Sequence, residues 1–211
     1  LSTINYNFTQ AVFFLALALF VDGVDGTLAR YVDVENVTPS VDGSVLDNII
    51  DYFNYVLVPT FMIHWFGFLG ENYSLFLCFL ILSVSSYTFA NKGIKTDDYY
   101  FSGFPALWNL VVLYFHLLGT SELINIAVVL FLSVFTFIPI KYVHPMRVLS
   151  LRKTTLMMTC FWSLTTVYLL LSVDSVNDIN RSLNLEYVIY CAWLAVNLYF
   201  LFTTLRRSFQ S

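Results

Sequence analysis

The sequence predicts an all-α integral membrane protein, a polytopic helical bundle with seven spans in this chain. Of the 211 residues, 58% are hydrophobic and only 11% are charged, a balance that soluble domains of ordinary composition do not have. Apolar runs long enough to cross a bilayer recur along the chain. The net charge of −4 is too small to indicate a polyanionic partner, so no nucleic acid is expected to bind.

Short connections separate the apolar runs, which indicates a single transmembrane domain over residues 1–211. The first run ends in an acidic stretch, and the second follows Asp42, whose carboxylate is expected to cap its first turn. The other five runs are mainly apolar, and the three cysteines lie within apolar runs as small hydrophobic residues. The expected spans cover residues 6–30, 43–66, 72–91, 103–119, 122–140, 154–173 and 186–205.

The basic residues predict the orientation of these spans, because loops rich in Lys and Arg remain on the cytoplasmic side. With the loop 31–42 inside, Arg181 is the only one of the ten Lys and Arg residues that falls outside. The acidic stretch therefore faces the cytoplasm. An odd number of spans places Leu1 near the outer face, so we expect one further helix before it.

Acidic residues gather in residues 21–52, which otherwise resemble membrane helix. Asp22 and Asp25 lie three residues apart near the end of the first span, and Asp47 and Asp51 lie four apart near the start of the second. Residues at these spacings share one face of a helix. Since a short loop makes the two spans antiparallel neighbours, we expect all four carboxylates to converge at the cytoplasmic end of the two helices.

Four converging carboxylates repel one another, and charge at membrane depth is costly, so a cation is expected among them. Ligands that are all oxygen atoms favour Mn²⁺ or Mg²⁺, and two such ions commonly assist displacement at phosphorus. Gly26, Ala29 and Gly43 leave room for a ligand beside the acids. Arg30 offers a planar guanidinium group, whose N–H donors suit the oxygen atoms of a phosphate group.

Two other interpretations of the acids stay open. Acids at helix ends often act only as caps or lie in a solvated loop, which is the interpretation that we adopt for Asp33 and Glu35. Acids within membranes also serve in the transport of a cation or a lipid. Transporter acids tend to lie near mid-bilayer on broken helices, however, whereas these lie at the ends of spans.

As a pattern, the acidic stretch is D-x2-D-G-x2-A-R-x12-G-x3-D-x3-D, which resembles the signature of the CDP-alcohol phosphatidyltransferases. The twelve residues between Arg30 and Gly43 exceed the common family spacing. This longer connection is similar to that of the bacterial phosphatidylcholine synthases, a branch of the family. Residues 46–59 and 95–109 also resemble that branch.

The resemblance implies a multi-pass enzyme of a bacterial inner membrane that transfers the phosphatidyl group of CDP-diacylglycerol to choline and releases CMP. It also implies a homodimer, surrounded by membrane lipids, with two Mn²⁺ or Mg²⁺ ions in each site. By position in the motif, Asp51 would be the general base, Asp22, Asp25, Asp47 and Asp51 would bind the ions, and Asp22, Gly26, Ala29, Arg30 and Gly43 would hold the CDP-lipid.

A quaternary ammonium group such as that of choline is usually held against aromatic faces, sometimes beside a carboxylate. Packing, or a place in the interfacial aromatic belt, is the alternative for each aromatic residue. Serine, inositol phosphate and glycerol phosphate stay open as acceptors, although an anionic acceptor would need more Lys or Arg beside the site. The candidate choline residues are Asn48, Tyr52, Tyr55, Asp97, Asp98, Tyr99, Tyr100 and Trp108.

Overall fold

The structure is a computed structural model of the chain, and it describes residues 7–91, 101–139, 141–142, 152–173 and 183–208. The chain divides into two compact units. The first contains Leu1–Asn91 and Ala106–Val134, and the second contains Lys92–Pro105 and Phe135–Ser211. Every predicted site residue that the structure describes lies in the first unit.

Side-chain caps begin two helices of the first unit. The side chain of Asn7 accepts a hydrogen bond from the N–H of Gln10 at 2.9 Å and begins α1, and Asp42 begins α3 in the same way. Such acceptors satisfy N–H groups that have no partner within the helix. The helices of this unit are α1 (Phe8–Tyr31), α2 (Val34–Val37), α3 (Gly43–Tyr52), the π-helix η1 (Phe53–Leu57), α4 (Val58–Trp65), α5 (Gly70–Ala90), α6 (Trp108–Leu118) and α7 (Glu122–Phe135).

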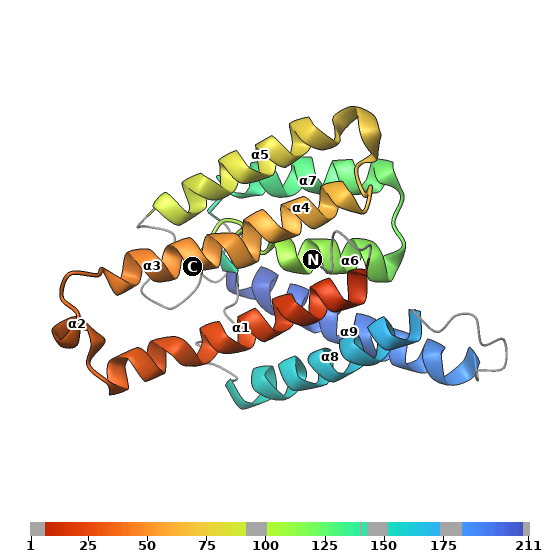
Figure 1. The fold of residues 1–211 in the computed structure, drawn as a ribbon. Helices are drawn as coiled ribbons and strands as arrows, with labels where there is room; N and C mark the ends of the chain where they lie inside the picture. Colours follow the sequence, from red (N-terminus) through yellow and green to blue (C-terminus); the bar gives the residue numbers. More distant parts are fainter. Residues whose placement is uncertain (1–6, 92–100, 140, 143–151, 174–182, 209–211) are drawn as a thin grey trace. The chain divides into compact units, whose positions relative to one another are not determined.

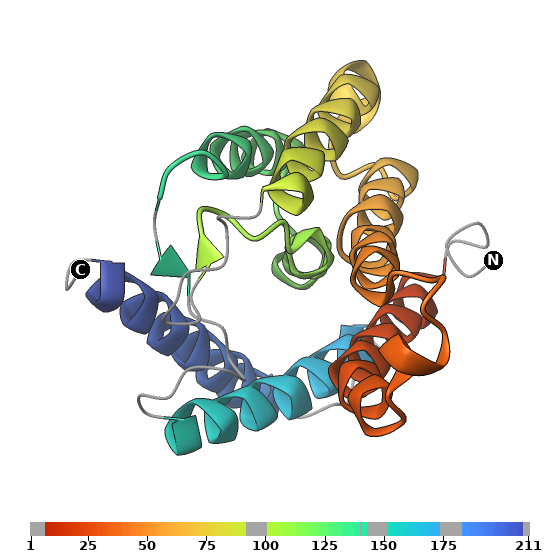
Figure 2. The same ribbon diagram turned by 90° about the vertical axis from the view of Figure 1, so that its left-hand side faces the viewer.

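The segment α3–η1–α4 is continuous and runs antiparallel to α1, with the short α2 between them (Figure 1). Seen from the side, α6 lies on the inner side of an arc formed by α3–α4, α5 and α7 (Figure 2). Accordingly, Trp108 and Val112 of α6 are fully buried, and α6 contacts both α4 and η1. Helix α6 is therefore the centre against which η1 and α4 pack, and these two elements continue the helix that carries Asp47 and Asp51.

Buried hydrogen bonds join the helices of the first unit. The indole N–H of Trp108 donates to Ser85 Oγ at 2.8 Å and joins α6 to α5. The side-chain amide of Asn125 on α7 donates to the main-chain oxygen of Phe68 at 2.9 Å, in the turn before α5. Because a buried polar group without such a bond is costly, these bonds favour one arrangement of the helices.

The second unit contains a strand pair and two long helices. A two-residue antiparallel pair joins Phe101 to Tyr142 and Ser102 to Lys141. Trp193 is fully buried, and its indole N–H donates to Thr166 Oγ1 at 2.9 Å, so it joins the two helices. The elements are β1 (Phe101–Ser102), β2 (Lys141–Tyr142), α8 (Arg152–Val173) and α9 (Leu183–Ser208).

The predicted polytopic helical fold is confirmed. Among the described residues, α1, α5, α8 and α9 each contain an apolar stretch long enough to cross a membrane, and α6 and α7 are shorter apolar helices. The span predicted over 103–119 begins only at Trp108, since Gly103 and Ala106 have positive φ. The span predicted over 122–140 already ends at Phe135. The strand pair and η1 were not predicted.

Gly103→Ala is expected to destabilise the protein strongly. Gly103 has a φ of +86°, and an added Cβ would meet the main-chain oxygen of Thr136 inside contact distance, where no flexible side chain can move away. Gly119→Ala is the matched control, since its φ is +56° but open space surrounds it. Only the left-handed backbone penalty of about 1–2 kcal/mol then applies to the control.

Thermal melting in detergent would compare the two variants. A Gly103→Ala protein that melts no lower than Gly119→Ala would contradict the close approach of Gly103 to Thr136.

Candidate active site

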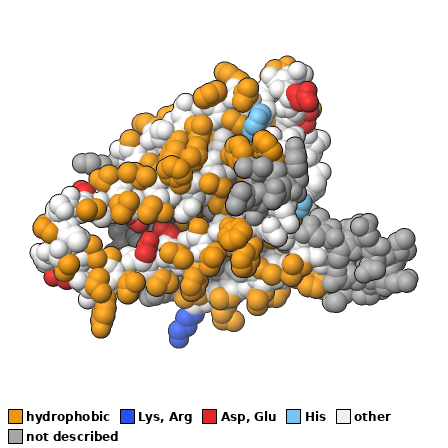
Figure 3. Space-filling model, in the orientation of Figure 1, with side chains coloured by type: hydrophobic (Ala, Val, Ile, Leu, Met, Phe, Trp, Pro, Cys, Tyr) orange, Lys and Arg blue, Asp and Glu red, His pale blue; other side chains and the backbone are white. Residues whose placement is uncertain are grey.

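Three of the four predicted metal-binding aspartates come together between α1 and α3. One carboxylate oxygen from each of Asp22, Asp47 and Asp51 lies within 4.8 Å of the other two. Asp22 and Asp51 are half-buried, and Asp47 is exposed. Acidic side chains are visible at the edge of a hollow between these helices (Figure 3). Asp25 follows on α1, half-buried and outside this group.

The chemistry of this group fits a hard divalent ion. All three donors are carboxylate oxygens, the ligands that Mg²⁺ and Mn²⁺ prefer. Oxygens on opposite sides of a bound Mg²⁺ lie about 4 Å apart, and the oxygens of this group all lie within 4.8 Å of one another. The Oδ1 atom of Asp51 is buried, where a negative charge benefits most from a nearby cation.

Tyr55 adds a contact to this group that the sequence analysis missed. Its hydroxyl donates to Oδ2 of Asp22 at 2.9 Å and so joins η1 to α1. The π-helix begins two residues after Asp51, and such turns are rare and often found at functional sites. A signal was present in the sequence, since Asp47, Asp51 and Tyr55 recur at a spacing of four.

Arg30 lies folded back along α1. Its Nη2 donates to Thr27 Oγ1 at 3.3 Å, and its Nη1 lies 3.5 Å from the place where a Cβ on Gly26 would stand. A methyl group at Gly26 would meet the guanidinium at an ordinary van der Waals distance, so this conformation of Arg30 does not require the glycine. Ala29 beside it is exposed. Arg30 is the only Lys or Arg among the described residues of the first unit.

Asp42 and Gly43 shape the beginning of α3. The Oδ1 of Asp42 accepts hydrogen bonds from the Ser44 hydroxyl at 2.8 Å and from the N–H groups of Ser44 and Val45 at 2.9 and 3.2 Å. These bonds, that of the Ser44 hydroxyl above all, hold the pKa of Asp42 below its ordinary value. The space beside Gly43 is open. Since the Asp42 carboxylate already accepts hydrogen bonds from the N–H groups of Ser44 and Val45, these two groups do not form a main-chain anion site.

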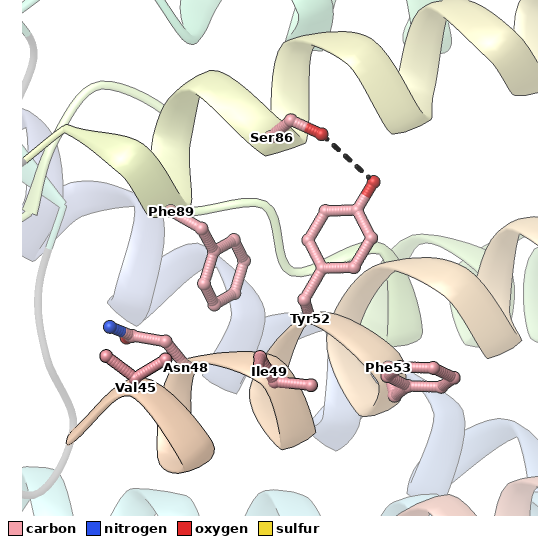
Figure 4. Close-up of a pocket in the computed structure, with 7 residues that line it drawn as sticks. All are labelled: Val45, Asn48, Ile49, Tyr52, Phe53, Ser86 and Phe89. Carbon is pink, nitrogen blue, oxygen red and sulfur yellow. Dashed lines mark hydrogen bonds between the residues drawn. The ribbon is translucent and has the colours of Figure 1, made fainter. Parts of the chain in front are cut away.

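Another face of α3 borders a groove against α5, the α3–α5 groove (Figure 4). The hydroxyl of Tyr52 donates to the main-chain oxygen of Leu82 at 2.9 Å and lies 3.3 Å from Ser86 Oγ. Asn48 and Tyr52 each follow an aspartate by one residue, so they are rotated about 100° from it. The groove has a volume of about 340 Å³ and is lined by Val45, Asn48, Ile49, Tyr52, Phe53, Ser86 and Phe89.

The predicted choline residues are thus not brought together by the described part of the structure. Tyr55 contacts the acids, whereas Asn48 and Tyr52 line the α3–α5 groove. Trp108 is fully buried, which accords with the packing role that the sequence left open. Asp97, Asp98, Tyr99 and Tyr100 lie outside the described residues, and their role stays a prediction.

Known proteins similar to this chain share a name. It is 42% identical over 154 residues to the phosphatidylcholine synthase of Mesorhizobium japonicum, in an alignment that covers 73% of the chain and 58% of that protein. The phosphatidylcholine synthase of Pseudomonas aeruginosa is 39% identical over 194 residues, or 92% of the chain and 78% of that protein. The phosphatidylcholine synthase of Legionella bozemanae is 36% identical over 191 residues, which are 87% of the chain and 88% of that protein. The chain thus spans less than two thirds of the Mesorhizobium protein and most of the other two.

The family match covers the site itself. Residues 1–138 match the family described as CDP-alcohol phosphatidyltransferase, and this segment includes the three clustered aspartates, Arg30 and Tyr55. The match and the relatives confirm the predicted transferase class and the predicted likeness to bacterial phosphatidylcholine synthases. The family match over residues 1–138 and these relatives show that the chain belongs to the CDP-alcohol phosphatidyltransferase family.

Proposed function

We propose that the chain is a phosphatidylcholine synthase, which transfers the phosphatidyl group of CDP-diacylglycerol to choline. The convergence of Asp22, Asp47 and Asp51 from two helices, within the segment that matches the family, carries this proposal. The names of the relatives supply the acceptor. The choline oxygen forms a bond to the phosphorus that carries diacylglycerol, and the bond from this phosphorus to the CMP oxygen breaks.

Asp51 is the proposed general base of this reaction. Its carboxylate is half-buried and belongs to the acidic group. The proton leaves the hydroxyl for Asp51 as the new bond to phosphorus forms. A carboxylate positioned in this way commonly accelerates such a step by about 10²–10⁴-fold.

Two Mn²⁺ or Mg²⁺ ions are the proposed cofactors, with Asp22, Asp25, Asp47 and Asp51 as their ligands. Such ions supply charge neutralisation at the phosphate oxygens when they are bound. The oxygen-only donor group of Asp22, Asp47 and Asp51 supports this assignment. Asp25, three residues beyond Asp22 on α1, supplies the remaining carboxylate on that side.

The proposed CDP-lipid site lies along the end of α1. Arg30 binds the diphosphate, and Gly26, Ala29 and Gly43 leave room beside Asp22 for the nucleotide. The acyl chains stay in the bilayer beside α1, whose surface exposes large hydrophobic side chains such as Phe13 and Phe20.

The distribution of basic residues supports a site on the cytoplasmic side of a bacterial inner membrane. The family resemblance supports a homodimer. For choline, we retain Tyr55 and residues 97–100 as the contacts beside the acids, and Asn48 and Tyr52 as contacts from the neighbouring groove.

The first experiment incubates purified protein in detergent with CDP-diacylglycerol, Mn²⁺ and labelled choline, and runs serine, inositol phosphate and glycerol phosphate in parallel. We expect label to enter lipid only from choline, with equal release of CMP, and we expect a chelator to stop both. Transfer of the phosphatidyl group to one of the other alcohols would show that choline is not the acceptor, but it would support the proposed class of reaction. A folded protein that releases no CMP from any mixture would refute the proposed reaction and favour a transport role.

Asp51→Asn is expected to bind CDP-diacylglycerol and to lose at least about 100-fold in kcat, the scale of general-base catalysis. Asp33→Asn is the matched control, because Asp33 lies before α2, outside the acidic group, and accepts hydrogen bonds from the side chain of Asn36. Its turnover should remain close to that of the wild type. A near-normal rate for Asp51→Asn, measured as CMP release, would remove Asp51 as the base.

Trp108→Phe is expected to lower the Tm without a selective effect on choline. The variant leaves the buried Ser85 hydroxyl without its indole donor, which costs about 1–3 kcal/mol. Ser85→Ala removes the other partner of the same bond and serves as the control. A KM for choline that rises in Trp108→Phe but not in Ser85→Ala would contradict the packing role and restore Trp108 to the choline site.

A further inference from the structure

The hydroxyl of Tyr55 makes a hydrogen bond that the proposed reaction does not use. It donates to Oδ2 of Asp22 at 2.9 Å, from η1 to α1, between residues 33 positions apart in the chain. Both side chains are half-buried. The bond therefore joins α1 to the turn that directly follows α3, at one of the carboxylates that form the acidic group.

The π-helix places Tyr55 on the same side as the aspartates of α3. In an α-helix, residues four apart drift by about 40° at each step, so Tyr55 would be turned about 80° from Asp47. Hydrogen bonds from i to i+5 hold more residues in each turn, which reduces this drift between Asp51 and Tyr55. The wide turn over Phe53–Leu57 thus suits the four-residue spacing of the two acids and the tyrosine.

We propose that Tyr55 is a positioning residue that fixes the Asp22 carboxylate for metal binding. The inference rests on the proposed function, because it concerns the same carboxylates. A hydrogen bond to one oxygen stops rotation of the carboxylate and partly neutralises it beside Asp47 and Asp51. Asp22 then remains in place against the repulsion of its neighbours, instead of turning away before an ion arrives. Partners of this kind, which hold a metal ligand from behind, commonly change metal affinity by about 10–100-fold.

This role differs from that of an aromatic face for choline. A choline contact depends on the ring of Tyr55, whereas positioning depends on its hydroxyl. Tyr55→Phe removes the hydroxyl and keeps the ring, so the variant separates the two roles.

Tyr55→Phe is expected to bind Mn²⁺ about tenfold more weakly than the wild type, at the lower end of the range for such partners. The measurement is an electron paramagnetic resonance titration of free Mn²⁺ over detergent-purified protein, with no substrate present. A second readout is the rise in Tm that Mn²⁺ produces, which should shrink in the variant. The KM for choline should stay near the wild-type value at saturating Mn²⁺.

Tyr52→Phe is the matched control for Mn²⁺ affinity. It deletes a hydroxyl from the same helical segment, but this hydroxyl is bonded to Leu82 of α5. The control should have a lower Tm than the wild type but the same affinity for Mn²⁺. A general loosening of the helices would weaken Mn²⁺ binding in both variants, whereas a local effect would weaken it only in Tyr55→Phe.

Unchanged or tighter Mn²⁺ binding by a folded Tyr55→Phe protein would overturn the inference. Equal weakening in Tyr52→Phe would overturn it as well, because the effect would then come from helix packing. A wild type that binds Mn²⁺ but transfers nothing to choline would refute the proposed function alone. A wild type that binds no Mn²⁺ would refute the metal site and this inference together.

Discussion

The site depends on holding three carboxylates within 4.8 Å of one another at the end of two membrane helices. Their repulsion grows as the surroundings become less polar, so the helices that carry them need firm contacts elsewhere. The Tyr52 hydroxyl holds α3 on α5, and η1 and α4 pack on α6. Trp108 in turn fixes α6 to α5. The packed side of the unit therefore offsets the repulsion on its acidic side.

Helix α3 separates these tasks by face. Its aspartates point toward α1, while Asn48 and Tyr52, one residue further along in each case, belong to the side that borders α5. The π-helix follows immediately and returns Tyr55 to the acidic side. Because such turns are often found at functional sites, we attribute the irregular turn to the site.

The acidic group was predictable because its causes are local. Spacings of three and four residues set the helix faces, and a short connection makes α1 and α3 neighbours, which brings Asp22, Asp47 and Asp51 together. The bond from Tyr55 to Asp22 was not predictable in this way, since it depends on a wide turn and on how η1 packs against α1. Trp108 shows a second limit, because a buried aromatic residue and a ligand-binding one look alike in an apolar sequence.

The beginning of α3 has a consequence for how the site fills. The Asp42 carboxylate already accepts hydrogen bonds from the N–H groups of Ser44 and Val45, so these two groups are closed to a diphosphate. Arg30 is the only Lys or Arg among the described residues of this unit, and one guanidinium cannot balance a diphosphate. In the proposed reaction, the ions would supply the rest of the charge that balances the diphosphate. Because such coupling is reciprocal, bound nucleotide and bound ions would each raise the affinity of the site for the other by the same factor.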